Sequence, residues 1–165
     1  MLGGTVFLAA TLLARNRLPP LTTAELDQAE RRWQTAGLEN YDMDVKVSGR
    51  QPGSFHVEVR QGEPVALTRN GVAPRRGMWD VWTVPGLFDT LHQELELADD
   101  PEGPFGSPPG TQVVQRAKFD GRYGFPRKYQ RIVMGTPLEI AWEVHRFRPL
   151  DARDAATSKA QGESR

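Results

Sequence analysis

The sequence predicts an α+β domain in which two helices pack on one face of an antiparallel sheet. Two observations carry this prediction. Two segments repeat apolar residues at three- and four-residue spacing, as an amphipathic helix does. Each is followed by short runs that alternate apolar and polar residues, as half-buried strands do, with Gly- and Pro-rich turns between them. The expected order is therefore helix, three strands, helix, three strands.

The first helix is expected at residues 23–36. Thr22 and Glu25 have the spacing of a capping box, in which two side chains satisfy free backbone N–H groups of the first turn. Gly37 suits the left-handed conformation that ends many helices. The apolar stripe of this helix consists of Leu26, Ala29, Trp33 and Ala36. Such a stripe is typical of a helix that covers a core.

Strict alternation then predicts three strands, the third of which begins at Val65 and ends near Asn70. The apolar phase of the first strand consists of Tyr41, Met43, Val45 and Val47. The polar phase of the first two strands consists of Asp42, Asp44, Lys46, His56, Glu58 and Arg60. Because the helices are expected to cover the apolar face, the polar face is expected to be open to solvent or to a partner.

The second helix is expected at residues 84–98, with Thr83 as its N-terminal cap and Pro85 in its first turn. The Pro- and Gly-rich segment 99–110 is expected to be a surface loop. The last three strands are expected near residues 113–119, 127–134 and 140–147. In the middle one, Tyr129, Ile132 and Met134 are out of simple phase, which favours a β-bulge.

The chain ends differ from this domain, which is expected to span residues 21–150. Residues 1–20 contain an apolar run followed by two arginines and are predicted to be a membrane-directed segment, so the protein is expected to be membrane-anchored or exported to the cell envelope. An uncleaved anchor, a signal peptide whose true start lies upstream of Met1, and a buried segment of the domain all stay open. Residues 151–165 lack an apolar pattern and are predicted to be a disordered tail.

Composition and residue spacing exclude several classes of function. The 21 basic and 21 acidic residues give zero net charge, so we do not expect nucleic acid as a partner. The absence of cysteine excludes disulfides and thiolate metal sites. His56, His92 and His145 have no metal-site spacing, so we expect them on the surface and expect no metal or cofactor. Asp42 and Asp44 share a strand face and could flank a cation or act as an acid/base pair, but the favoured interpretation is an exposed charged strand face without a site.

Several short motifs, taken in their order along the chain, resemble a known bacterial family. They are Arg32-Trp33, Gly37-Leu38-Glu39-Asn40-Tyr41, the hairpin at Gly62, Thr83-Val84 with Leu87-Phe88, Tyr123-Gly124-Phe125-Pro126, and Trp142-x-Val144-x-x-Phe147. Over residues 29–147 the chain resembles domain-of-unknown-function family 6174. The resemblance implies export, because members often carry lipoprotein or signal segments, and it implies no activity. The Cys-x-Cys pair of many members is replaced here by Val47-Ser48-Gly49-Arg50, so a thiol role is excluded.

The turn at residues 119–126 carries aromatic rings between glycines. Tyr123 and Phe125 are expected to plug the end of the core, because a buried aromatic ring contributes a large apolar area. An exposed aromatic patch for a partner is the alternative.

Three hypotheses of function follow from these features. The favoured one is a non-enzymatic domain that binds a protein or peptide through the polar sheet face or an exposed edge strand. Its candidate binding residues are Lys46, His56, Glu58, Arg60, Tyr123 and Phe125. The alternative is a small-ligand pocket between sheet and helices, lined by Trp33, Phe88, Tyr129 and Trp142. The third is a hydrolase that uses Asp42 or Asp44 with His56.

Overall fold

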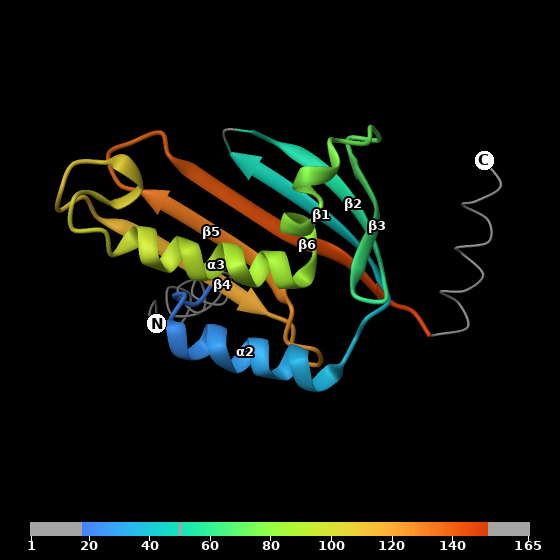
Figure 1. Ribbon diagram of the computed structural model, residues 1–165. Helices are drawn as coiled ribbons and strands as arrows, with labels where there is room; N and C mark the ends of the chain where they lie inside the picture. Colours follow the sequence, from blue (N-terminus) through green and yellow to red (C-terminus); the bar gives the residue numbers. More distant parts are fainter. Residues whose placement is uncertain (1–17, 50, 152–165) are drawn as a thin grey trace, which may run out of the picture.

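The computed structural model describes residues 18–49 and 51–151. The predictions of a membrane-directed segment and of a disordered tail lie outside the described residues, except at their inner ends. Within these two ranges, no helix has the length and hydropathy needed to cross a bilayer. The described part forms a layer of helices against a twisted sheet (Figure 1).

Six strands form one antiparallel sheet in this part of the chain, which confirms the α+β class and the antiparallel sheet. The strands are β1 (Tyr41–Gly49), β2 (Gly53–Arg60), β3 (Glu63–Arg69), β4 (Val113–Phe119), β5 (Pro126–Val133) and β6 (Glu139–Pro149). Their order across the sheet is β3-β2-β1-β6-β5-β4. Two three-stranded meanders therefore join at the centre, where β1 pairs with β6, and β3 and β4 are the two edges.

Two α-helices, α2 (Thr23–Ala36) and α3 (Val84–Ala98), pack side by side against the sheet (Figure 1). Their bounds agree with the sequence prediction because both begin at a cap made by local hydrogen bonds. The Thr22 hydroxyl oxygen accepts the backbone N–H of Glu25 at 3.3 Å, and that of Thr83 accepts the N–H of Gly86 at 3.2 Å. At the C-terminal end of α2, Gly37 has the expected left-handed conformation.

The order of elements differs in detail from the prediction. The 3-10 helices η1 (Arg76–Met78) and η2 (Asp80–Trp82) precede α3, and η3 (Pro104–Gly106) precedes β4. Each is a single short turn with hydrogen bonds from residue i to residue i+3. Three residues are too few to establish an apolar period, so the sequence pattern could not reveal them.

The core lies between the helices and the inner face of the sheet. Its largest fully buried side chains include Tyr41, Met43, Val45, Val57 and Tyr129 from the strands, and Leu26, Leu87, Phe88 and Leu91 from the helices. The Tyr41 hydroxyl accepts the backbone N–H of Val84 at 3.0 Å, which joins the first strand to the start of α3. Burial raises the pKa of Tyr41 to about 12, so this hydroxyl stays neutral.

Register shifts explain where simple alternation fails. Between β1 and β6 the register shifts after Asp44, so that Val144 and Phe147, three residues apart, both face inward. Between β4 and β5 the shift lies at the start of β5, where Phe119 pairs with Pro126, and from Lys128 onward β5 and β6 pair regularly. The mixed phase of β5 has a second cause, because the inward-facing residue between the buried Tyr129 and Val133 is a charged Arg131.

Candidate functional site

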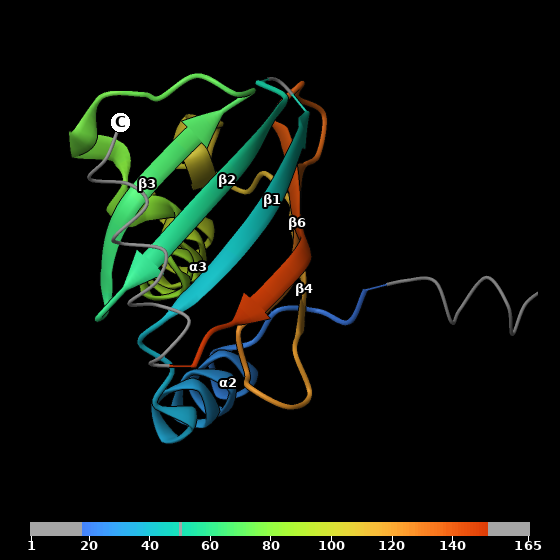
Figure 2. The same ribbon diagram turned by 90° about the vertical axis from the view of Figure 1, so that its right-hand side faces the viewer.

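Figure 2 shows the outer face of the sheet, opposite the helices. This face carries a network of ion-paired side chains. At its centre Asp42 forms ion pairs with Arg60 of β2, at 2.8 Å, and with Arg148 of β6. The Arg60 guanidinium also lies 3.2 Å from the Glu58 carboxylate and donates to the carbonyl oxygen of Val59 at 2.9 Å. Asp42 is 5% exposed and Arg60 9%. The expectation that these two residues lie open to solvent is therefore wrong.

The register explains this burial. Asp42 is paired with Glu58 on one side and with Arg148 on the other, so both neighbouring strands place a charged side chain against it. The guanidinium groups of Arg60 and Arg148 lie against the Asp42 carboxylate and shield it from solvent. Alternation identifies the face of a residue but does not identify its cross-strand neighbours, which depend on the register.

The Asp42 carboxylate stays ionised in this environment. Burial by itself raises the pKa of a carboxyl group, but hydrogen bonds and charge from Arg148 and Arg60 outweigh burial and lower the pKa of Asp42 below its ordinary value. Asp42 is thus held as a permanent negative charge between two guanidinium groups. Such a charge stabilises the fold and does not serve as a general acid or base near neutral pH.

His56 and Asp44 do converge, which their spacing in sequence did not show. They are directly opposite each other on β2 and β1, and the His56 Nδ1 atom lies 2.6 Å from Asp44 Oδ1. The second ring nitrogen, Nε2, lies 3.5 Å from the Glu58 carboxylate, and Arg146 pairs with the other oxygen of Asp44 at 2.6 Å. Both nitrogens of the ring thus face carboxylates.

This cluster lacks the parts of a hydrolytic site. Activation of a hydroxyl needs a nucleophile within hydrogen-bond reach of the base, and no serine or threonine hydroxyl among the described residues bonds to His56. The described ranges also contain no group of three His, Cys, Asp or Glu residues placed to hold a metal ion. Of the other histidines, His92 of α3 lies 3.0 Å from Glu30 of α2, and His145 is exposed. The geometry gives the hydrolase hypothesis no support.

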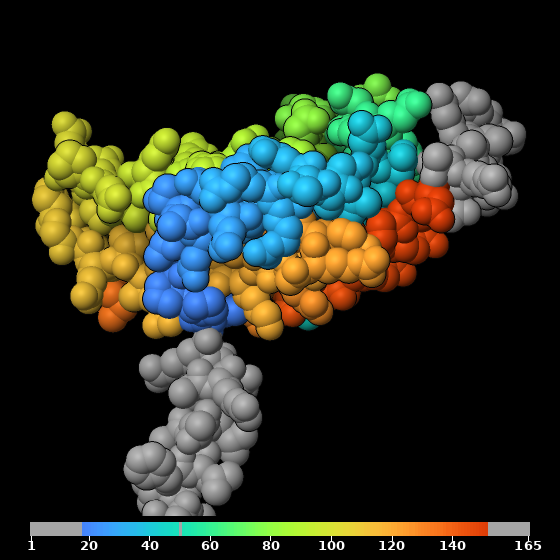
Figure 3. Space-filling view, turned by 90° about the horizontal axis from the view of Figure 1, so that it is seen from below, coloured from blue at the N-terminus to red at the C-terminus, as the bar shows by residue number. Residues whose placement is uncertain are grey.

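The aromatic rings of the turn at residues 119–126 pack against the hydrophobic core and close one end of it. Phe125 is 4% exposed and stacks on Phe147 at 4.3 Å between ring centroids, while the half-buried Tyr123 lies 6.1 Å from the same ring. Gly124 has a positive φ of 86°, and a Cβ atom there would lie 2.3 Å from the carbonyl oxygen of Ala29 on α2. Figure 3 shows α2 in blue against the orange segment that contains this turn. Phe125 is therefore not accessible to a partner.

The four residues expected to line a ligand pocket are packed in the core. Phe88 and Tyr129 are fully buried, and Trp33 and Trp142 nearly so. The Tyr129 and Trp142 ring centroids lie 5.7 Å apart, and Trp33 packs edge-on against Tyr41. The two surface hollows beside α2 are lined by other residues. A ligand among these four side chains would require the core to open.

A second buried ionic cluster, which the sequence did not reveal, lies under α3. The Glu94 carboxylate accepts from Arg131 at 2.7 and 2.8 Å and from the Tyr129 hydroxyl at 2.7 Å. The Arg131 guanidinium also lies 4.0 Å above the ring of Phe105. Burial, and then the Glu94 charge, raise the pKa of Tyr129. A glutamate in a helix and an arginine in a strand give no signal until the two elements are placed together.

The two edges of the sheet differ in how far their outward backbone groups are hydrogen-bonded to other parts of the chain. The β4 edge is covered by the chain that precedes α2: Leu21 donates to the carbonyl oxygen of Gln115 at 3.0 Å, and Ala117 donates to that of Pro19 at 3.1 Å. On the β3 edge, Arg69 exchanges two backbone hydrogen bonds with Val72. The backbone N–H and C=O groups of Arg69 therefore point away from β2. Backbone groups alternate in direction along a strand, so those of Leu67 face outward too. Among the described residues, they have no hydrogen-bond partner.

Most of the exposed large apolar side chains belong to β3 and to the segment that follows it. Four of the six large apolar side chains that are exposed in the described ranges are on β3 or in the segment that follows it, namely Val65, Val72, Met78 and Val81. Val65 is 49% exposed and Val72 71%. Figure 2 shows the segment after β3 returning beside the open edge toward the start of α3. We call these four side chains together with the outward backbone groups of Leu67 the β3 edge site.

Comparison with known families gives a match for the first three strands and the two α-helices of this fold. Residues 25–100 match the model of a family of unknown function, DUF6174. The match confirms the resemblance noted from the sequence motifs. It runs from α2 to the end of α3 and includes the β3 edge site, whereas the motifs from Tyr123 onward lie outside it. No curated protein shows a significant match to the chain.

Proposed function

We propose that the protein is a non-enzymatic domain of the cell envelope that binds a peptide segment of a partner protein as an additional strand at β3. The single observation that carries the proposal is the contrast between the two sheet edges. One edge is covered by the protein's own chain, and the other presents unpaired backbone groups beside exposed apolar side chains. An extended peptide that adds to such an edge gains main-chain hydrogen bonds, and apolar contacts give it specificity.

The geometry limits the peptide that fits. A register shift between β2 and β3 at Glu58/Val59 interrupts regular pairing, and Val72 occupies the outward backbone groups of Arg69, so the peptide is expected to pair with the outward N–H and C=O groups of Leu67. The peptide is therefore short and carries apolar side chains that contact Val65 and Val72.

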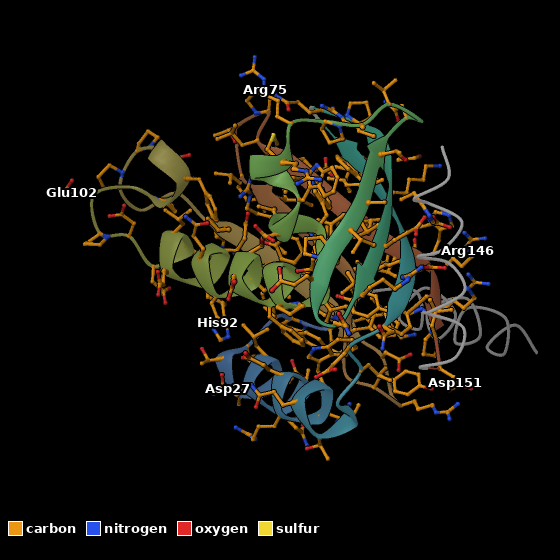
Figure 4. All side chains as sticks on the ribbon, turned by 45° about the vertical axis from the view of Figure 1, so that its right-hand side comes forward. Asp27, Arg75, His92, Glu102, Arg146 and Asp151 are labelled. Carbon is orange, nitrogen blue, oxygen red and sulfur yellow. The ribbon has the colours of Figure 1, made fainter. Side chains whose placement is uncertain are left out.

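Two arginines near this edge indicate the charge of the peptide. Arg75 lies at the end of the sheet away from Asp27 of α2 (Figure 4), and Arg75 and Arg76 are both exposed. An acidic residue at the peptide end that reaches these arginines completes the expected pattern.

The polar outer face is less suited to binding than the sequence indicated. Of its candidate residues, Arg60 is buried, and His56 and Glu58 are engaged in ion pairs. Lys46 is exposed and forms no ion pair with a described residue. A partner on this face would have to break existing pairs, whereas a strand at β3 would form new hydrogen bonds.

A peptide selection with the full-length chain tests the proposal. Short peptides selected from a random display library are measured for affinity to the wild-type chain, to the double variant Val65→Lys with Val72→Lys, and to the matched control Leu97→Lys with Met134→Lys. Both variants replace exposed apolar side chains and add two charges. We expect the first variant to weaken binding about tenfold or more, because charges on an edge strand oppose pairing, and the control to bind as the wild type does.

Equal affinity of the two variants would show that the peptides bind elsewhere, and Lys46→Glu would then identify the outer face as their site. A library that yields no peptide for the wild-type chain also contradicts the proposal. The envelope location needs a separate measurement, which is carbonate extraction of membranes from cells that express the full-length chain. We expect the protein in the membrane pellet or the exported fraction, and full recovery in the cytoplasmic fraction would refute that location.

A further inference from the structure

A shallow hollow lies on the surface between α2 and Arg122 of the aromatic turn, the two segments that Figure 3 shows side by side in blue and orange. It measures about 370 Å³ and is lined by Gln28, Arg31, Arg32, Thr35, Ala36 and Arg122. Three of these six residues are arginines and none is acidic. The Gln28 side-chain amide adds an uncharged hydrogen-bond donor at the hollow.

Two of the three guanidinium groups are held in place. Arg32 donates to the carbonyl oxygen of Asp120 at 3.3 Å, which ties it to the turn. The Arg122 guanidinium lies 4.8 Å above the ring of Tyr123, itself packed near Phe147. A guanidinium held in this way loses less conformational entropy when it binds a ligand.

These arginines have no carboxylate partner among the described residues. Neither Arg31, Arg32 nor Arg122 forms an ion pair within residues 18–49 and 51–151, although nine such pairs occur elsewhere in those ranges. The Asp120 carboxylate accepts the backbone N–H groups of Arg122 and Tyr123 at 2.9 and 2.8 Å, so it is engaged within the turn. Glu25 lines an adjacent groove together with Arg32 and Lys118. Positive charge therefore exceeds negative charge around the hollow.

We propose that this hollow, which we call the α2 arginine site, binds a phosphate-bearing anion. Several convergent guanidinium groups are the arrangement that recognises phosphate oxygens, because each planar group can donate two parallel hydrogen bonds. Adjacent to the hollow, the groove that contains Lys118 is also lined by Pro19, where the chain continues toward the N-terminal segment. The phosphate can therefore belong to a soluble ligand or to a lipid headgroup, and the recognising chemistry is the same.

The test uses the full-length chain and inorganic phosphate as its probe, at ionic strength held constant with chloride. Arginine side-chain N–H signals are followed by NMR in the wild type, in the double variant Arg31→Gln with Arg122→Gln, and in the matched control Arg75→Gln with Arg76→Gln. We expect saturable shifts at Arg32 in the wild type and in the control. In the first variant we expect the apparent affinity to fall about tenfold or more, because two charge-assisted donors are lost.

A second experiment, vesicle binding, distinguishes a lipid headgroup from a soluble anion as the source of the phosphate. Vesicles of phosphatidylcholine with and without phosphatidylglycerol are compared for binding of the same three chains. A preference for phosphatidylglycerol that only Arg31→Gln with Arg122→Gln abolishes assigns the site to a lipid headgroup, and phosphate binding without that preference assigns it to a soluble anion. If chloride produces the same shifts, or if both variants respond alike in both experiments, the α2 arginine site does not exist.

Discussion

Asp42 shows how one residue on an apparently exposed strand face can support the fold. Its carboxylate is buried between guanidinium groups from two neighbouring strands, and its pKa is lowered. In the unfolded chain the same carboxyl group has an ordinary pKa, near 3.8. Its contribution to stability is therefore complete above that value and is lost as the pH falls toward the lower folded-state pKa.

We expect Asp42→Asn to lower the free energy of unfolding by about 2–3 kcal/mol at pH 7, because it leaves buried arginine charge without its central counter-charge. Urea denaturation of wild type and variant from pH 7 to pH 2 is the measurement. The difference between the two proteins should be constant above about pH 5 and should shrink as the pH falls below about 4. A difference that does not depend on pH would mean that Asp42 acts through packing and not through charge.

Gly124 is a second residue whose role the structure defines. Its positive φ and its close approach to the carbonyl oxygen of Ala29 leave no room for a Cβ atom. We expect Gly124→Ala to destabilise the protein by about 2 kcal/mol or more, since it combines left-handed strain with a backbone clash. Gly121, in the same turn, has open space around its Cβ position. Thermal unfolding should therefore show almost no change for Gly121→Ala, and equal effects at both glycines would contradict the close contact with α2.

At the scale of elements, the Glu94–Arg131 pair joins α3 to β5 inside the helix-covered layer. Removal of one partner leaves a largely buried charge, so we expect Glu94→Gln and Arg131→Met each to cost about 2 kcal/mol or more. In the double variant both charges are gone, and we expect it to be less destabilised than the sum of the two single variants by about 1 kcal/mol or more. Additive losses in urea denaturation would show that the two side chains do not interact.

The elements themselves were largely predictable from the sequence. Both helices begin at a threonine whose hydroxyl accepts an N–H group three residues later, and such a cap is a local interaction that the sequence shows directly. The apolar phase of β1 was likewise predictable, because residues 41 to 47 alternate without interruption. The register shifts were less accessible, since they depend on how two distant strands pair.

The candidate site was predictable only in part, for the same reason. The charged residues of the outer face were assigned to the correct face, yet their mutual neutralisation depends on register, as the pairing of Asp44 with His56 shows. The sequence also indicated an edge strand as a binding element. Which edge is open depends on the path of residues 18–21 along β4, and no periodicity encodes that path.

At the scale of the whole molecule, the fold separates three surfaces. The outer sheet face is occupied by its own ion pairs, and β3 presents an open edge. On α2 and the aromatic turn lie three arginines that form no ion pair with another residue of the described ranges. The two proposed sites lie at different places, so they can be tested independently. Arg31→Gln with Arg122→Gln should leave peptide binding unchanged, and Val65→Lys with Val72→Lys should leave phosphate binding unchanged. Loss of both activities in either double variant would indicate damage to the fold as a whole.

The most direct measurement is amide hydrogen exchange at Leu67 in the full-length chain, with and without a selected peptide. In the free protein this N–H group faces outward and has no partner among the described residues, so we expect it to exchange rapidly. If the peptide adds as a strand at β3, the Leu67 amide becomes protected while the exchange of β4 amides stays unchanged. Rapid exchange at Leu67 in the saturated complex would contradict the proposal that β3 is the binding edge.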